Sequence, residues 1–224
     1  SMLTSRRTAR ARALDDRLPI YFKGSDGKTA ATGQTVGRQT MLKALSLLNA
    51  KLTQAGSTHT LWMIGGGAIM LHLDGRDSSG DLDVIPRKGD FRALLGFAEE
   101  VAQEMRQAGT PLPEDWINGD FTPQFMTMGI GANDFVEDSR YHWSHLNIKF
   151  ARPELLLAMK CFSFRPEGND LGDIAFLMKK IPVRSLDHLY DIIETYGDID
   201  MIAGGEEDGD VLLEALAKKV LGRA

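Results

Sequence analysis

The chain has 224 residues, of which 43% are hydrophobic and 25% are charged, a composition ordinary for a globular protein. Its length suits one domain, or one domain with a small helical appendage. The formal net charge of −5 excludes the overall basic field that many nucleic-acid-binding proteins carry.

The cysteine content and the hydropathy indicate the compartment. A single cysteine, Cys161, cannot form an internal disulfide, which suits a reducing environment. It lies in an apolar helical run, so we expect a buried and inert thiol. No apolar run approaches the roughly 20 residues that span a membrane. We therefore expect a soluble, cytoplasmic protein with no membrane partner.

Residues 1–38 are polar and rich in Arg, Gly, Thr and Ser, which predicts a flexible or irregular N-terminal extension. Its first 17 residues contain five arginines. A solvated tail and an arm that touches RNA or a partner both fit this composition.

Residues 39–150 predict alternating helices and strands. Apolar residues at helical spacing predict helices, and short apolar or alternating runs predict strands. Gly56 and Gly109 are placed to end two of the helices, and Asp90 to cap one. The expected elements are helix 39–54, strand 61–64, helix 68–73, strand 81–85, helix 91–105, strand 125–130 and strand 145–150.

Residues 151–224 predict helices only, and a second Asp-x-Asp at 198–200 is expected in a loop. The expected helices are 153–164, 170–179, 185–196 and 210–221. Strands followed by a helical tail indicate an α+β fold. We expect a mixed β-sheet core flanked by helices over 39–150, with the helical C-terminal part, 151–224, packed on it.

The most informative stretch is residues 61–86, where an apolar run meets Gly65, Gly66 and Gly67 and a short helix precedes Asp81 and Asp83. Residues two apart on a strand share a face, so the two carboxylates project together. They repel unless a cation lies between them, and Mg²⁺ prefers such oxygen ligands. The glycines allow close approach of a phosphate and expose N–H groups at a helix start.

This order of strand, glycines, helix and Asp-x-Asp strand resembles the signature of the nucleotidyltransferase superfamily. More specifically, it resembles the AbiEii-type proteins, many of them toxins of toxin–antitoxin pairs, and a related uncharacterised bacterial family. Two later segments also resemble that family: PLPEDWINGDF (Pro111–Phe121) and ARPELLLAMKCFSFRPEGNDLGDIAFLMKK (Ala151–Lys180). The resemblance covers roughly residues 40–196, in four blocks in the family order, and implies a nucleotidyltransferase-like sheet core.

The resemblance also implies a function. A nucleoside triphosphate would bind with Mg²⁺ or Mn²⁺, and a nucleoside monophosphate would pass to a hydroxyl of tRNA or of a protein. An antitoxin would be a further partner. Asp81 and Asp83 would be the catalytic metal ligands. The nucleotide-binding residues implied are Gly65, Gly66, Gly67, Arg76, Ser79, Lys160 and Asp173. Arg76 stands one residue before the family's usual arginine position, which Asp77 occupies here.

The chain departs from the superfamily in its third carboxylate. Such enzymes usually add an Asp or Glu from a later strand as general base and metal ligand. The outward positions of strand 145–150 are His145, Asn147 and Lys149, none of them acidic. Either the base comes from the preceding loop, which contains Asp134, Glu137 and Asp138, or catalysis is weak or absent.

Two other kinds of function therefore stay open. One is a non-catalytic nucleotide-binding or partner-binding module on the same fold. The other is a regulatory RNA-binding protein that uses its arginine-rich arm.

Overall fold

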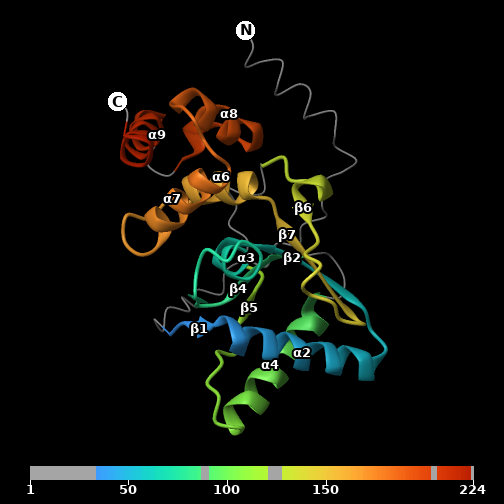
Figure 1. Ribbon diagram of the computed structural model, residues 1–224. Helices are drawn as coiled ribbons and strands as arrows, with labels where there is room; N and C mark the ends of the chain where they lie inside the picture. Colours follow the sequence, from blue (N-terminus) through green and yellow to red (C-terminus); the bar gives the residue numbers. More distant parts are fainter. Residues whose placement is uncertain (1–33, 87–90, 121–127, 203–205, 223–224) are drawn as a thin grey trace. The chain divides into compact units, whose positions relative to one another are not determined.

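The structure, a computed structural model, describes residues 34–86, 91–120, 128–202 and 206–222. In these residues it is a mixed α+β protein with seven α-helices, a five-stranded mixed sheet and a two-stranded sheet (Figure 1). The α+β class predicted from the sequence is thereby confirmed.

The chain divides into two compact units. Of the described residues, the sheet unit comprises 34–86, 91–120 and 135–151. The helical unit comprises the described residues 128–134, 152–202 and 206–222.

The sheet unit is built on a five-stranded sheet in the order β5-β4-β2-β7-β6. Central strand β2 pairs antiparallel with β4 and parallel with β7, while β5 is parallel to β4 and β6 antiparallel to β7. Residues Leu61–Ile64 of β2 are all buried, as expected for a strand covered on both faces. The bounds are β2 His59–Ile64, β4 Leu82–Ile85, β5 Ile117–Asn118, β6 Phe135–Val136 and β7 Leu146–Ala151.

Among its described residues, the sheet unit has three helices: α2 (Arg38–Ala55), α3 (Gly65–Leu71) and α4 (Phe91–Gln107). Helices α2 and α4 pack against each other (Figure 1). Helix α2 buries the apolar face that its spacing predicted, and it ends at Gly56, whose left-handed conformation (φ 67°) lets its N–H bond the last turn.

Several predicted boundaries in the sheet unit were wrong. Helix α3 begins at Gly65 rather than at residue 68, so the glycines form its first turn. Strand β4 begins at Leu82, one residue after Asp81. Val36–Gly37 form strand β1, which pairs with β3 (Ser78–Ser79), although an irregular extension was predicted there.

Three of the expectations fall on residues outside the described ranges. The arginine-rich arm of residues 1–33 and the cap at Asp90 lie there entirely. The strand expected at 125–130 lies there in part, and its described residues, 128–130, are not in a strand.

The helical unit contains α6 (Pro153–Phe162), α7 (Asp170–Lys180), α8 (Leu186–Tyr196) and α9 (Glu206–Leu221). Pro153 occupies the first turn of α6, where its missing N–H costs no hydrogen bond. Ser185 caps α8 by accepting from the His188 N–H. Two single-turn helices, η2 (Ala132–Asp134) and η3 (Ile199–Met201), complete the unit, and η3 replaces the loop predicted at 198–200.

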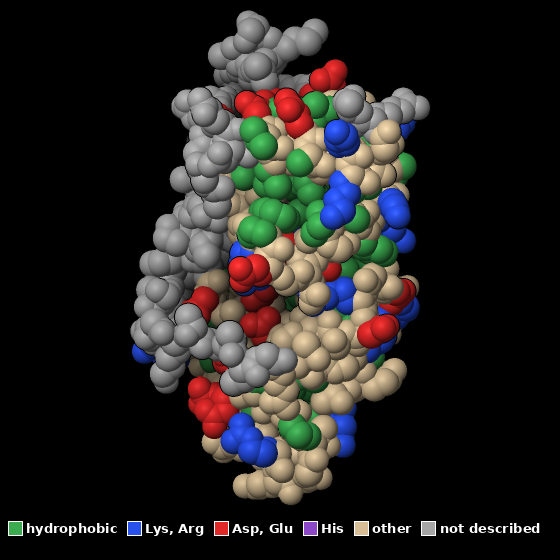
Figure 2. All heavy atoms as spheres, turned by 90° about the vertical axis from the view of Figure 1, so that its left-hand side faces the viewer, with side chains coloured by type: hydrophobic (Ala, Val, Ile, Leu, Met, Phe, Trp, Pro, Cys, Tyr) green, Lys and Arg blue, Asp and Glu red, His purple; other side chains and the backbone are tan. Residues whose placement is uncertain are grey.

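No helix in the described ranges is long and apolar enough to cross a membrane. On the described residues of the face drawn in Figure 2, acidic, basic and hydrophobic side chains are interspersed. This agrees with the moderate net charge of the sequence.

Candidate functional site

The three glycines lie where the backbone of α3 packs against the segment that carries the two aspartates. Gly65 has a φ of 66°, and a Cβ atom at this position would stand 2.7 Å from Asp83 Oδ2. A Cβ at Gly67 would stand 2.7 Å from Leu82 Cδ2. A side chain at either position would force the Asp83 or the Leu82 side chain to move, and the positive φ of Gly65 favours glycine further. The turn therefore holds the backbone of α3 directly beside Asp83.

The side chains of Arg76 and Ser79 lie beside the same glycine turn. A Cβ atom at Gly66 would overlap Arg76 Nη1 and would stand 3.2 Å from Ser79 Oγ. The one-residue offset of Arg76 in the sequence thus does not keep it from the glycines. Ser79 is buried, and its hydroxyl donates to the main-chain carbonyl of Asp81 at 2.8 Å. This bond fixes the backbone that leads into β4.

Asp81 and Asp83 converge on one amide group. Asn118 Nδ2 lies 3.4 Å from Asp81 Oδ2 and 3.2 Å from Asp83 Oδ1. The two carboxylates therefore share one side of the sheet, as their spacing predicted. Both side chains are partly exposed. Such a pair of oxygen donors fits a hard divalent cation, which keeps several of its waters when only one or two carboxylates bind it.

Asn118 is the residue that the sequence analysis missed. It lies on β5 directly opposite Asp83 of β4, in the parallel register that also pairs Leu82 with Ile117. The preceding Trp116 is fully buried, and its Nε1 donates to the Ala98 carbonyl at 2.8 Å. A two-residue strand is too short for a periodicity signal. The one available signal was its place two residues after Trp116, in a segment that resembles the family.

Strand β7 contributes Asn147 and Lys149 to the face that carries Asp83. The register shows this, because Ile64 pairs with Asp83 while Trp62, two residues earlier on β2, pairs with Lys149. Lys149 Nζ lies 3.0 Å from Glu137 Oε1. The hydrogen bond from Lys149 lowers the pKa of Glu137 below its ordinary value. Glu137 is thus an ion-pair partner, which makes it a weaker base.

The other two carboxylates proposed as a base are also engaged. Asp134 belongs to the helical unit, where it accepts from the Gly131 N–H at 2.8 Å and from Tyr196 Oη at 3.0 Å. Asp138 lies 2.9 Å from His72 Nδ1 and 2.8 Å from Arg140 Nη2. In the described part of the chain, no group of three or more His, Cys, Asp or Glu residues is arranged to hold a metal.

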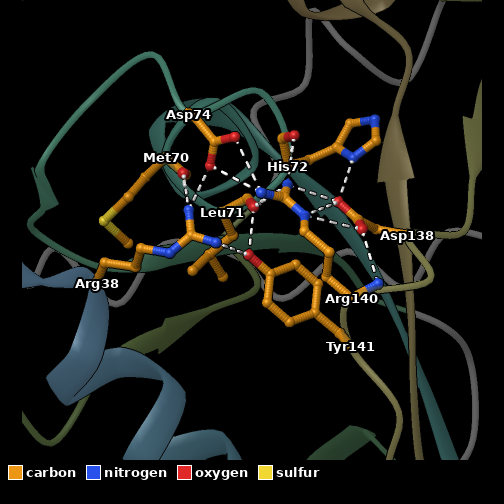
Figure 3. Close-up of polar contacts among 8 residues, drawn as sticks. All are labelled: Arg38, Met70, Leu71, His72, Asp74, Asp138, Arg140 and Tyr141. Atoms are coloured by element: carbon orange, nitrogen blue, oxygen red, sulfur yellow. Dashed lines mark hydrogen bonds and ion pairs between the residues drawn. The ribbon is translucent and has the colours of Figure 1, made fainter.

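Asp138 belongs to a polar cluster at the C-terminal end of α3, which we name the α3 clamp (Figure 3). Its guanidinium groups donate to the last carbonyls of α3: Arg38 to Met70 at 3.1 Å, and Arg140 to Leu71 at 2.9 Å. Cations at this end of a helix also complement the helix dipole. The clamp comprises Arg38, His72, Asp74, Asp138, Arg140 and Tyr141, together with the carbonyls of Met70, Leu71 and His72.

The electrostatics of the α3 clamp indicate a structural role. The hydrogen bond from Arg140 is the largest cause that holds the pKa of Asp138 well below its usual range, against the opposing effect of burial. Asp138 is therefore a poor proton acceptor. Because α3 has only seven residues, fixing its C-terminal end also fixes the glycine turn at its start.

Lys160 and Asp173 form a separate cluster within the helical unit. Lys160 Nζ lies 3.0 Å from Asp170 Oδ1 and 3.0 Å from Asp173 Oδ2. Both aspartates are buried, 3% and 4% exposed. Burial opposes ionisation of Asp170 and tends to raise its pKa. The charge of Lys160 and its hydrogen bond outweigh this effect, so the pKa of Asp170 is lowered. The predicted contact of Lys160 and Asp173 with a nucleotide stays a prediction.

Comparisons with models of protein families, with curated proteins and with solved structures found no match to this chain.

Proposed function

We propose that the sheet unit is a nucleotidyltransferase-like core that binds a nucleoside triphosphate with Mg²⁺ or Mn²⁺. One observation carries the proposal: the Asp83 carboxylate and the Arg76 guanidinium both lie against the same three-glycine turn. Carboxylates select a divalent cation, and a guanidinium selects phosphate oxygens. A triphosphate with its cation is matched by such a pair of groups at one turn.

The residues divide the binding between them. Asp81 and Asp83 would hold the cation, and their convergence on Asn118 Nδ2 supports this assignment. Arg76 would contact phosphate oxygens beside Gly66. The cation would supply charge neutralisation on the phosphates. Ser79 has a supporting role, because its hydroxyl holds the main chain of Asp81.

The activity that we propose is transfer of a nucleoside monophosphate to a hydroxyl. By the resemblance in sequence, the acceptor is a tRNA end or a protein side chain, and a toxin paired with an antitoxin is the corresponding biological role. We expect transfer to be slow. No third carboxylate joins Asp81 and Asp83 among the described residues, and a positioned general base contributes about 10²–10⁴-fold.

The absence of a third carboxylate beside Asp81 and Asp83 among the described residues supports a second candidate function. A protein with two metal-binding aspartates and no general base is suited to bind a nucleotide or a partner without catalysis. Transfer and binding without transfer can be separated experimentally.

The experiment is label transfer. The full chain is incubated with Mg²⁺, α-labelled nucleoside triphosphates and total cellular RNA or protein, and each triphosphate is also titrated calorimetrically with and without Mg²⁺. We expect slow transfer that disappears in Asp83→Ala and persists in Asp115→Asn, a change at an exposed position outside the site.

The alternative outcomes are distinct. Binding without transferred label for any nucleotide identifies the non-catalytic module. If Asp81→Asn with Asp83→Asn leaves cation-dependent binding unchanged, the assignment of the site is wrong.

A further inference from the structure

Asn118 occupies a defined position between the two candidate metal ligands. It is the direct partner of Asp83 in the β4–β5 register, so the two side chains share a face of the sheet. Its amide nitrogen, Nδ2, donates to Asp81 Oδ2 and to Asp83 Oδ1, at N···O distances of 3.4 and 3.2 Å. A neutral amide therefore donates to both carboxylates at once.

The orientation of this amide is fixed from its other end. Asn118 Oδ1 accepts from the Asp120 N–H at 2.8 Å. The amide oxygen is thereby directed at a main-chain donor, which leaves the two N–H groups for the carboxylates. The strand itself is held because the Leu82 N–H donates to the Trp116 carbonyl at 2.7 Å.

Asp83 shows what this orientation achieves. Its Oδ1 accepts from Asn118, while its Oδ2 faces the Gly65 side of the turn, 2.7 Å from the position of a Cβ there. The two oxygens of one carboxylate thus have different surroundings. The hydrogen bond to Oδ1 fixes the rotation that directs Oδ2 toward the turn.

We propose that Asn118 is a positioning residue for the metal site: it holds one oxygen of each aspartate and stays in place when the cation binds. This inference rests on the proposed function, because it presumes that Asp81 and Asp83 bind a cation. Groups that orient metal ligands typically contribute about 10–100-fold to metal affinity. The opposite arrangement, in which the amide fills the cation position and is displaced, predicts tighter binding when Asn118 is removed.

The test uses Mn²⁺ alone as the probe and the full chain. Affinity is measured by electron paramagnetic resonance of free and bound Mn²⁺ for wild type, Asn118→Leu and the double variant Asp81→Asn, Asp83→Asn. Leucine has the same branch point at Cγ as asparagine but is larger, and it donates no hydrogen bond. Asn49→Leu is the matched control, since Asn49 Oδ1 accepts from the His145 N–H at 2.8 Å, outside the site.

A second measurement does not depend on how well Asn118→Leu folds. Wild-type protein labelled with ¹⁵N at asparagine is titrated with diamagnetic Mg²⁺, and the Asn118 side-chain resonance is assigned from its loss in Asn118→Asp. We expect the amide protons of Asn118 to remain protected from exchange with water when Mg²⁺ is bound. Loss of that protection at saturating Mg²⁺ would overturn the inference.

The expected result is an affinity for Mn²⁺ about 10–100-fold lower in Asn118→Leu and unchanged in Asn49→Leu. Equal or higher affinity in Asn118→Leu overturns the role of Asn118 and leaves the metal site standing, provided that the double variant has lost binding. Unchanged binding in the double variant instead overturns the proposed function itself.

Discussion

The carboxylate of Asp83 and the backbone of Gly65 approach so closely that a Cβ at position 65 would stand 2.7 Å from Asp83 Oδ2 and would force that carboxylate to move. The left-handed φ of Gly65, 66°, adds a second requirement for glycine. The same close contact therefore constrains both Asp83, a candidate metal ligand, and the glycine turn that is proposed to hold phosphate.

Gly65→Ala should lower the free energy of unfolding and weaken Mn²⁺ binding. The left-handed conformation alone costs alanine about 1–2 kcal/mol, and the collision with Asp83 adds to it. Urea unfolding and Mn²⁺ titration measure the two effects. Gly96→Ala is the control: Gly96 lies inside α4 with nothing near its Cβ position, so alanine should stabilise by about 0.5–1 kcal/mol.

Asp138→Asn should flatten the acid end of the stability profile. The pKa of Asp138 is depressed in the folded protein, chiefly by Arg140, so its stabilisation is present above the unfolded pKa near 4 and is lost as pH falls below it. At pH 7 the free energy of unfolding of the variant should be about 1–3 kcal/mol below that of wild type. As the pH falls further, the free energy of unfolding should decrease less in the variant than in wild type. Urea unfolding between about pH 5 and pH 2 measures this, with exposed Asp115→Asn as control.

Parallel profiles for wild type and Asp138→Asn would contradict the role given to Asp138 in the α3 clamp.

Lys160→Met should destabilise the helical unit by about 3–5 kcal/mol, because it removes the cation that lies 3.0 Å from each of the buried Asp170 and Asp173. Lys180→Met, at the exposed end of α7, is the control and should change little. Guanidinium unfolding without ligand measures both. A destabilisation no greater than that of the control would show that the ion pairs contribute little to folding.

Cys161 should not react with thiol reagents in the folded protein. Burial raises the pKa of its thiol to about 12, so at pH 8 almost none is thiolate, and no exposed surface admits the reagent. Labelling with a disulfide reagent should be complete only in denaturant. Rapid labelling of the native protein would mean that α6 opens readily.

The sequence predicted most helices and both long strands of the sheet, because buried positions recur at a regular spacing along the helices and β7 and form an unbroken apolar run in β2. The spacing of Met41, Leu45 and Leu48 anticipated the buried face of α2. Strand β7 alternates as predicted, with Leu146, Ile148 and Phe150 buried. The shared side of Asp81 and Asp83 followed from the twofold period of a strand.

The remaining features depend on contacts between distant residues, which periodicity does not encode. The two-residue strands β1, β3, β5 and β6 have no pattern of their own, so the position of Asn118 beside Asp83 could not be inferred. The first turn of α3 was missed because three glycines disfavour a helix locally. The α3 clamp supports this helix from its other end, through Arg38 and residues 138–141.

The parallel pairing of β2 with β7 has a consequence during synthesis. Strand β2 is complete at Ile64, whereas its neighbour begins only at Leu146, so a nascent chain carries one edge of an apolar strand open until that residue has left the ribosome. An exposed apolar edge is a template for pairing with other chains. Fragments that end before residue 146 should therefore aggregate.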